Sequence, residues 1–175
     1  MRFWRDFTVA ILGTWLSAGC GKSGRTTAPP SPSQTASVPD KPLPKLPTVK
    51  LWLGSQEINA EVAQTPIQLE TGMMFRTNLA ETEGMLFLLP YTQPASFWMK
   101  NCLLPLSVAY IDPEGILEEV HDLEPGNTDL VRSASANIRF ALEVNRGWFA
   151  RHQVSTGMVV RTERGSLTET FFGRR

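Results

Sequence analysis

The sequence predicts a β-rich α+β fold, a single compact domain in which short strands form a rolled sheet or barrel with one or two small helices. Three observations predict this class. Short apolar runs recur between residues that favour turns. Residues 138–144 alternate apolar and polar side chains, as a half-buried strand does. Residues 95–112 form the densest aromatic and aliphatic run outside the N-terminal segment, interrupted by Lys100 and Asn101. This patterning favours a barrel or rolled sheet over a layered parallel one.

The expected strands lie in a globular domain that we place at residues 49–162. In chain order they are 49–53, 58–63, 84–89, 96–100, 106–111, 116–123, 138–144 and 158–161. The first two flank Gly54-Ser55 and predict a β-hairpin. Residues 106–111 are apolar on both faces, which indicates a strand buried on both sides. In 138–144, by contrast, one face should be buried and the other, which carries Glu143, should be polar.

Two small helices are expected between these strands. Thr65, Pro66 and Gln68 form a helix start signal, because Thr can cap the helix, Pro suits its first position and Gln can complete a capping box. Gly72 is placed to end this helix. A second helix is expected at 147–154, with Asn145 as its cap. The tail, residues 163–175, either packs on the domain or stays loose.

Residues 1–20 have the features of a secretory signal peptide, with basic residues at the start and a short apolar segment after them. The apolar segment is too short to span a bilayer, which takes about 20 residues. The segment ending at Cys20 resembles the bacterial lipoprotein box, in which the cysteine is acylated and begins the mature chain. Ser17 stands where that box usually has leucine. We expect lipidation at Cys20; cleavage after Ala18 or Gly19, giving a free periplasmic protein, is the alternative.

Residues 21–48 are rich in Pro, Ser, Thr and Ala and have almost no large apolar side chain before Leu43. Such a segment cannot bury enough apolar surface to offset its chain entropy, so it is expected to be a disordered linker. An anchor, a spacer and a domain are typical of an exported protein that is lipid-anchored in the bacterial cell envelope, at the outer membrane or the periplasmic face. The membrane is therefore an expected partner.

The charge and the motif content exclude several classes of function. Lys plus Arg and Asp plus Glu both number 17, so the formal net charge is zero and there is no electrostatic reason to expect nucleic acid as a partner. No glycine-rich phosphate loop, nucleophile elbow or paired-cysteine motif is present. Neither His121 nor His152 has a partner at metal-ligand spacing. No metal or other cofactor is predicted.

Cys102 is the one thiol of the domain and lies in an apolar run. A cysteine beside an imidazole can be a nucleophile. An inert buried cysteine is the ordinary state in apolar surroundings, and this is the expectation for Cys102.

The order and spacing of several blocks carry a resemblance to a known family. The blocks are Thr71 to Arg76, Gly84 to Phe87, Phe97 to Asn101, Pro105-Leu106, Ile111-Asp112 with Gly115, and Leu142 to Asn145 with Gly147-Trp148. Over about residues 57–160 they resemble the bacterial and archaeal family called domain of unknown function 192. The resemblance implies a small β-rich domain, often exported, and supplies no activity.

Four positions depart from the pattern of that family. Thr71 stands where Arg is usual, Cys102 where Thr is usual, and Ser107 and Met158 where Asp is usual. If the acidic positions support a site in the family, the site of this chain is altered.

A set of mostly polar residues embedded in apolar sequence is the candidate ligand-binding site. Its members are Met74, Arg76, Trp98, Lys100, Asn101, Glu143 and Asn145. Polar groups converging in an apolar, aromatic-lined concavity are typical of small-molecule sites. The alternative is structural: Arg76 and Glu143 form a buried pair, while Asn101 and Asn145 bind loop backbone. Phe97, Met85 and Leu106 are expected to be core residues with no further role.

Two classes of function stay open. The first is a non-catalytic binding or accessory domain that holds a small molecule or an envelope protein. The second is a hydrolase that uses Glu143 as general base, with Lys100 or Arg76 stabilising negative charge. The first is favoured because the sequence offers no nucleophile and few titrating groups. No catalytic residue is assigned.

Overall fold

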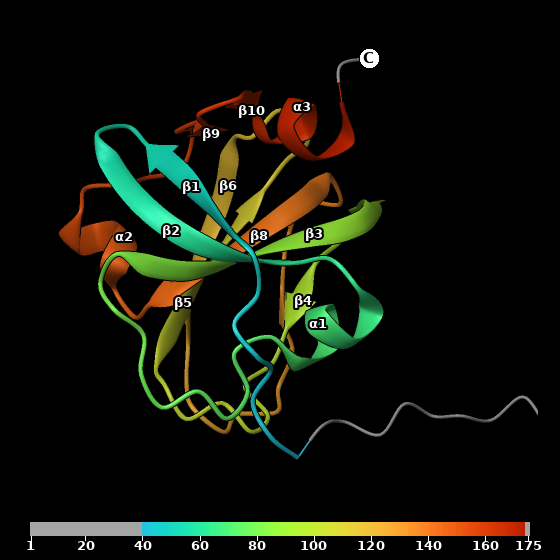
Figure 1. Ribbon diagram of the computed structural model, residues 1–175, viewed down its shortest axis with the longest axis vertical. Helices are drawn as coiled ribbons and strands as arrows, with labels where there is room; N and C mark the ends of the chain where they lie inside the picture. Colours follow the sequence, from blue (N-terminus) through green and yellow to red (C-terminus); the bar gives the residue numbers. More distant parts are fainter. Residues whose placement is uncertain (1–39, 174–175) are drawn as a thin grey trace, which may run out of the picture. The chain divides into compact units, whose positions relative to one another are not determined.

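The computed structural model describes residues 40–173 (Figure 1). The predicted signal peptide, Cys20 and most of the predicted linker lie outside these residues. The elements are β1 (Thr48–Leu53), β2 (Gln56–Ala63), α1 (Pro66–Thr71), β3 (Glu83–Gln93), β4 (Ser96–Phe97), β5 (Leu106–Ile111), β6 (Leu117–Leu123), β7 (Val131–Arg132), β8 (Ile138–Asn145), α2 (Trp148–Arg151), β9 (Val160–Thr162), β10 (Gly165–Ser166) and α3 (Leu167–Phe172). None of the helices in the described part is long and apolar enough to cross a membrane.

Eight of the strands form one mixed sheet in the order β10-β9-β1-β2-β3-β8-β5-β6. β2 and β3 are parallel, and the other neighbouring strands are antiparallel. The sheet is rolled: the amide of Val160 donates to the carbonyl of Gly115 at 2.8 Å, so residues next to β6 meet β9. It does not close into a barrel. This rolled, strand-rich domain with short helices confirms the predicted fold class.

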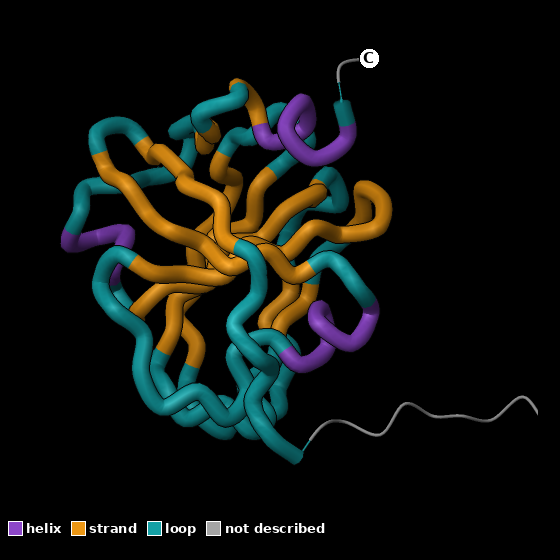
Figure 2. Tube along the Cα trace, viewed as in Figure 1, coloured by secondary structure: helices purple, strands orange, loops and turns teal. Residues whose placement is uncertain are grey.

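Two buried clusters of apolar side chains lie on the two faces of the sheet. Alternation along β3 shows the division, because Leu86 belongs to the first cluster and Met85 and Phe87 to the second. The first cluster packs against α2 and α3 through Trp148 and Leu167. Loops cover the second cluster, and Figure 2 shows them gathered below the strands in that view.

This two-sided burial corrects the prediction for the strand at 138–144. Phe140, Leu142 and Val144 of β8 lie in the first cluster, as expected. The opposite face is buried as well, because Ala141 is fully buried and Glu143 is only 3% exposed. Alternation in the sequence indicates which side chains share a face of the strand. Whether each face is buried depends on loops that are far away in the sequence. The strand at 106–111 is buried on both faces, as predicted.

Local signals located both predicted helices, but the cap of the second was wrong and the helix is shorter than predicted. α1 has the predicted capping box, in which Thr65 caps the helix and Gln68 reaches back to the backbone amide of Thr65. α2 is capped by Gly147, so the prediction of Asn145 as its cap was wrong. The predicted strand 96–100 is also shorter than expected, because β4 ends at Phe97 and a turn follows.

The C-terminal tail packs on the domain. Ser166 and Glu169 form a second capping box at the start of α3. Leu167 is fully buried in the first cluster, and Phe171 packs against that cluster.

Candidate functional site

A pocket of about 440 Å³ opens between α1, the turn that follows α1, and β4. In Figure 1, α1 lies beside β4 and below β3. The volume lies within the range of about 300–1,000 Å³ that is common for small-molecule sites. The lining residues are Pro66, Leu69, Glu70, Thr71, Gly72, Met73, Met74, Phe87, Leu89, Gln93, Pro94, Ala95, Ser96, Phe97, Trp98, Cys102 and Glu143.

The buried end of the pocket, which we call its floor, lies at Phe87 and Glu143. The turn after α1 packs closely against this floor because Gly72 lacks a side chain. Gly72 has φ of 48°, in the left-handed region that favours glycine. A Cβ built there would lie 3.1 Å from the ring of Phe87 and 3.9 Å from Oε2 of Glu143. The glycine therefore lets the chain pack directly on Phe87, and its neighbours Thr71 and Met73 line the same pocket as Glu143.

Glu143 is a buried acidic group on the pocket floor. It lies in β8, between Met85 of β3 and Val108 of β5, and both neighbours belong to the second apolar cluster. Its Oε2 atom is buried and has no hydrogen-bond partner among the described residues. Burial raises the pKa of Glu143 to about 8, because the charged form loses its hydration and no cation replaces it. The side chain is therefore mostly protonated at pH 7.

Thr71 is a second buried polar group at the same pocket. Its side chain is 1% exposed, and its Oγ1 atom has no hydrogen-bond partner in the described part of the chain. An unsatisfied buried polar group costs about 1 to 3 kcal/mol. Thr71 and Glu143 thus form a pair of unsatisfied groups that line one cavity.

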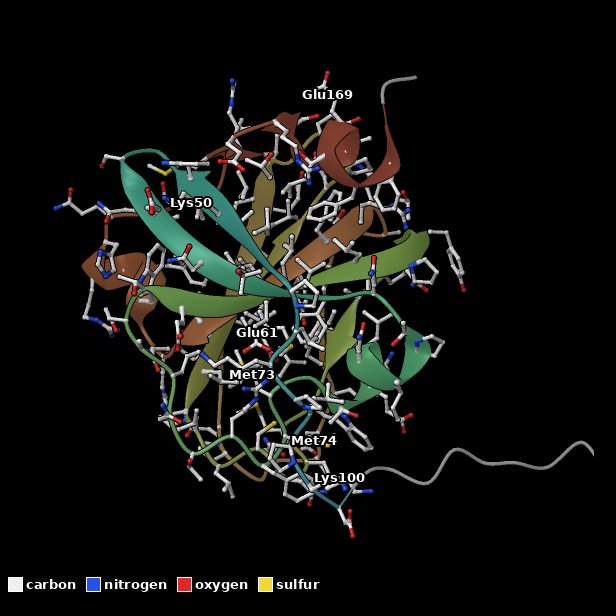
Figure 3. All side chains as sticks on the ribbon, in the orientation of Figure 1. Lys50, Glu61, Met73, Met74, Lys100 and Glu169 are labelled. Atoms are coloured by element: carbon white, nitrogen blue, oxygen red, sulfur yellow. The ribbon has the colours of Figure 1, made fainter. Side chains whose placement is uncertain are left out.

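Aromatic side chains form much of the pocket wall. Phe87 and Phe97 meet edge to face, with ring centroids 4.9 Å apart, and Trp98 continues the lining. The expectation that Phe97 is only a core residue was therefore incomplete. Met73 and Met74 also line the pocket and are almost fully buried, and Figure 3 shows both below the sheet.

Cys102 lines the pocket, but its thiol is not activated as a nucleophile. It is 6% exposed, and burial together with the charge of Glu143 raises the pKa of its thiol to about 12. The thiol is protonated at neutral pH, so a thiolate nucleophile is not available.

Arg76 does not pair with Glu143, so that structural alternative was wrong. Its Nη2 atom donates to Oε2 of Glu61 at 2.8 Å. The same Glu61 oxygen accepts the amide of Leu46 at 2.8 Å. The parallel pairing of β2 and β3 and the course of the chain after α1 bring Glu61 to Arg76, and neither could be predicted from the local sequence.

The remaining predicted site residues lie outside the pocket lining. Nδ2 of Asn145 donates to the carbonyls of Leu79 and Ala80, so this side chain holds loop backbone as the structural alternative proposed. Asn101 has φ of 58°, and its carbonyl accepts the amide of Phe75 at 2.9 Å. Lys100 does not line the pocket; its Nζ lies 5.2 Å from the centroid of the Trp98 ring.

The structure therefore brings together Met74, Trp98 and Glu143 from the predicted set and adds Thr71, Phe97 and Cys102. Thr71 and Cys102 were visible in the sequence as departures from a pattern, which was the signal available. Among residues 40–173, no group of three His, Cys, Asp or Glu side chains is arranged to hold a metal ion.

Comparison with known proteins identifies the relatives of this domain. The matching family model covers residues 49–162 and describes DUF192, an uncharacterized ACR. The chain belongs to the DUF192 family. No functionally curated protein matches it.

Two solved structures are similar to this DUF192 chain. A protein from Sinorhizobium meliloti 1021, described as a candidate transcription regulator, has 32% identity and a TM-score of 0.62, covering 66% of this chain and 92% of that one. A protein of unknown function from Novosphingobium aromaticivorans DSM 12444 has 26% identity and a TM-score of 0.63, and the match covers 82% of this chain and 99% of that one.

The departures from the DUF192 pattern fall in different places. Thr71 and Cys102 line the pocket. Ser107 is fully buried and structural, because its Oγ donates to Asp122 at 2.5 Å and accepts the amide of Gly147 at 2.8 Å. Of the positions expected to depart from the family pattern, Thr71 and Cys102 thus line the pocket, and Ser107 does not.

Proposed function

We propose that this chain is a lipid-anchored protein of the bacterial envelope whose DUF192 domain binds a small, partly apolar molecule without transforming it. One observation carries the binding proposal. Glu143 and Thr71 are almost fully buried, have unsatisfied oxygen atoms, and line the same aromatic-walled pocket. A ligand with polar groups facing the floor would satisfy both oxygens and bury its apolar body against the wall.

The pocket geometry supports binding better than hydrolysis. In the hydrolase alternative, Glu143 is the general base and Arg76 or Lys100 stabilises negative charge. The raised pKa of Glu143 suits a base. Arg76, however, is engaged by Glu61, and Lys100 does not line the pocket. A developing oxyanion would therefore meet no cationic side chain in the described lining.

The sequence carries the anchoring part of the proposal. Cys20 ends a segment that resembles a lipoprotein box, and the linker that follows separates it from the domain. Tethering at the envelope would give the pocket access to small molecules of that compartment.

A fragment screen of the full-length chain tests the binding proposal. We expect ligand-observed NMR to detect compact fragments that combine an aromatic ring with one polar group. Ser96 is exposed and lines the pocket, so Ser96→Trp should narrow the pocket and lower the affinity for these fragments at least about tenfold. Thr77 is exposed and outside the lining, so Thr77→Trp is the matched control.

Circular dichroism should show that both variants are folded. If no fragment binds the wild type, or if Ser96→Trp binds fragments as well as Thr77→Trp does, the pocket is not a ligand site.

A further inference from the structure

We infer that the natural ligand of this pocket is an organic cation, with N–H groups of an amine, amidinium or guanidinium directed at Glu143 and an apolar body against the aromatic wall. This inference rests on the proposed binding function and adds the chemical class of the ligand. It follows from the charges in the pocket, the hydrogen bonds open at its floor and the nature of its walls.

The acidic and basic side chains of the described lining are two carboxyl groups and no cation. Glu143 lies at the floor, and Glu70 is exposed on the pocket lining. No Lys, Arg or His belongs to this lining. The nearby cations are used elsewhere, because Arg76 pairs with Glu61 and Lys100 lies on the Trp98 ring. A cationic ligand would therefore supply the charge that the pocket lacks.

The groups that surround Glu143 do not neutralise it. On β3 and β5 its direct neighbours are Met85 and Val108, which are apolar. The titratable groups coupled to it are Cys102 and Tyr110, and burial raises the pKa of each, so both are uncharged at pH 7. The Tyr110 hydroxyl already donates to the carbonyl of Val131 at 2.6 Å.

The hydrogen-bonding atoms of the floor can accept hydrogen bonds from a cationic ligand once Glu143 is ionised. An ionised carboxylate only accepts hydrogen bonds, and a planar amidinium or guanidinium can donate to it through two parallel N–H groups. Oε2 of Glu143 is open for such a contact, and the Thr71 hydroxyl can accept a further N–H. A ligand anion would instead lie beside two carboxyl groups.

The walls suit the same ligand class. Cations are attracted to the faces of aromatic rings within about 6 Å, most strongly when they are desolvated. Phe87, Phe97 and Trp98 supply these rings, and Lys100 already contacts the ring of Trp98 in this way. Met73 and Met74 add polarizable surface that adapts to the apolar body of a ligand.

Binding of a cation should expel the proton of Glu143. The free pocket holds a mostly neutral carboxyl at pH 7, because the pKa of Glu143 is about 8. A cation stabilises the carboxylate, so complex formation releases about one proton at pH 7. Affinity should rise about tenfold per pH unit below this pKa and level off above it.

Calorimetry with three probes of nearly equal shape tests the inference on the full-length chain. The probes are benzamidine, which is cationic, benzamide, which is neutral, and benzoate, which is anionic. At pH 7 we expect benzamidine to bind at least about tenfold more tightly than benzamide, and benzoate to bind most weakly. Titrations in buffers of different ionisation enthalpy should show release of about one proton with benzamidine and none with benzamide.

Two matched variants locate the effect. Glu143→Gln keeps the side-chain volume. It should raise the Kd of benzamidine at least about tenfold and abolish proton release, while the Kd of benzamide should change by no more than about twofold. Glu118→Gln makes the same substitution at an exposed position outside the pocket lining, so it should change the affinity for benzamidine by no more than about twofold.

The outcomes separate the inference from the proposed function. If benzamide or benzoate binds as tightly as benzamidine and competes with it, the pocket binds ligands and the cation inference is wrong. If Glu143→Gln keeps the preference for benzamidine, or if Glu118→Gln removes it, the inference is wrong as well. If neither these probes nor any screened fragment binds, the proposed function itself fails.

Discussion

Arg76 is bound by Glu61 and leaves Glu143 without a cationic partner. Nη2 of Arg76 donates to Oε2 of Glu61 at 2.8 Å, and the two side chains are only 15% and 12% exposed. Two glutamates that both lie opposite Met85 of β3, one on each neighbouring strand, therefore have different roles. Glu61 completes an ion pair that joins β2 to the turn after α1, whereas Glu143 lines a pocket and is unsatisfied at Oε2.

The first prediction concerns this ion pair. Glu61→Gln leaves a largely buried guanidinium uncompensated and should lower the free energy of unfolding by about 3 kcal/mol. Adding Arg76→Met should recover much of that loss, because the uncompensated charge is removed. Chemical denaturation of the single and double variants gives the coupling energy.

Glu143 supplies the control for that cycle. The effects of Arg76→Met and Glu143→Gln should add to within about 0.5 kcal/mol, because Glu143 does not contact the guanidinium. Strong coupling of Arg76 with Glu143, or its absence between Arg76 and Glu61, would contradict the pairing.

The second prediction is the pH dependence of Glu143→Gln. The folded-state pKa of Glu143 is about 8, above the ordinary value of 4.5, so the unfolded chain loses this proton first. The contribution of Glu143 to stability is therefore full below about pH 4.5 and is lost progressively as the pH rises to about 8. At pH 7 the loss is on the order of 3 kcal/mol.

Glutamine cannot ionise, so the advantage of Glu143→Gln over the wild type should grow between pH 5 and pH 8 and then stay constant. Urea denaturation at several pH values measures it, and the exposed Glu70→Gln should show no such trend. A pH-independent difference, or a variant that is less stable than the wild type at pH 8, would argue that Glu143 is paired.

Local signals allowed much of the fold to be predicted. The capping box at Thr65 and the hairpin around Gly54 depend on residues close in the sequence, and both are present. A comparable signal, Ser166 with Glu169, was available for α3 and was not recognised.

The site was harder to predict because its contacts are not local. The burial of Glu143 depends on Met73, Met74 and Cys102, which reach the second face of the sheet from two separate turns. The partner of Arg76 depends on the register that parallel β2 and β3 adopt. Alternation along residues 138–144 could indicate which side chains share a face, but not which loops cover it.

The third prediction concerns position 71, where the family resemblance leads us to expect arginine and where an arginine side chain would fill the pocket. Thr71→Arg places a cation in the lining that contains Glu143, so a buried pair can form and the unsatisfied hydroxyl is removed. We expect the variant to melt a few degrees higher at pH 7 and to lose benzamidine binding. Thr71→Val removes the hydroxyl without adding charge and is the control; it should bind benzamidine more weakly than the wild type does, but measurably, because Glu143 remains. A Thr71→Arg variant that binds benzamidine like the wild type would show that Thr71 does not face the ligand.

The fourth prediction concerns Cys20, which precedes the described residues. If Cys20 is acylated, a fatty-acid probe should label the protein in cells, and Cys20→Ala should abolish the label and release the protein from membranes. Cys102→Ala is the matched control and should keep the label, since Cys102 is buried in the domain. Wild-type protein that is soluble and unlabelled would contradict the anchor.

The most direct test of the account is the titration of Glu143 itself. Carbon-13 NMR of glutamate side-chain carboxyl carbons can follow each group through its protonation, and Glu143→Gln assigns the resonance. The account predicts a midpoint near pH 8 in the free protein, raised by burial, and a lower midpoint when benzamidine saturates the pocket. A midpoint near the ordinary value of 4.5 that benzamidine leaves unchanged would contradict it, because Glu143 would then already be solvated or paired.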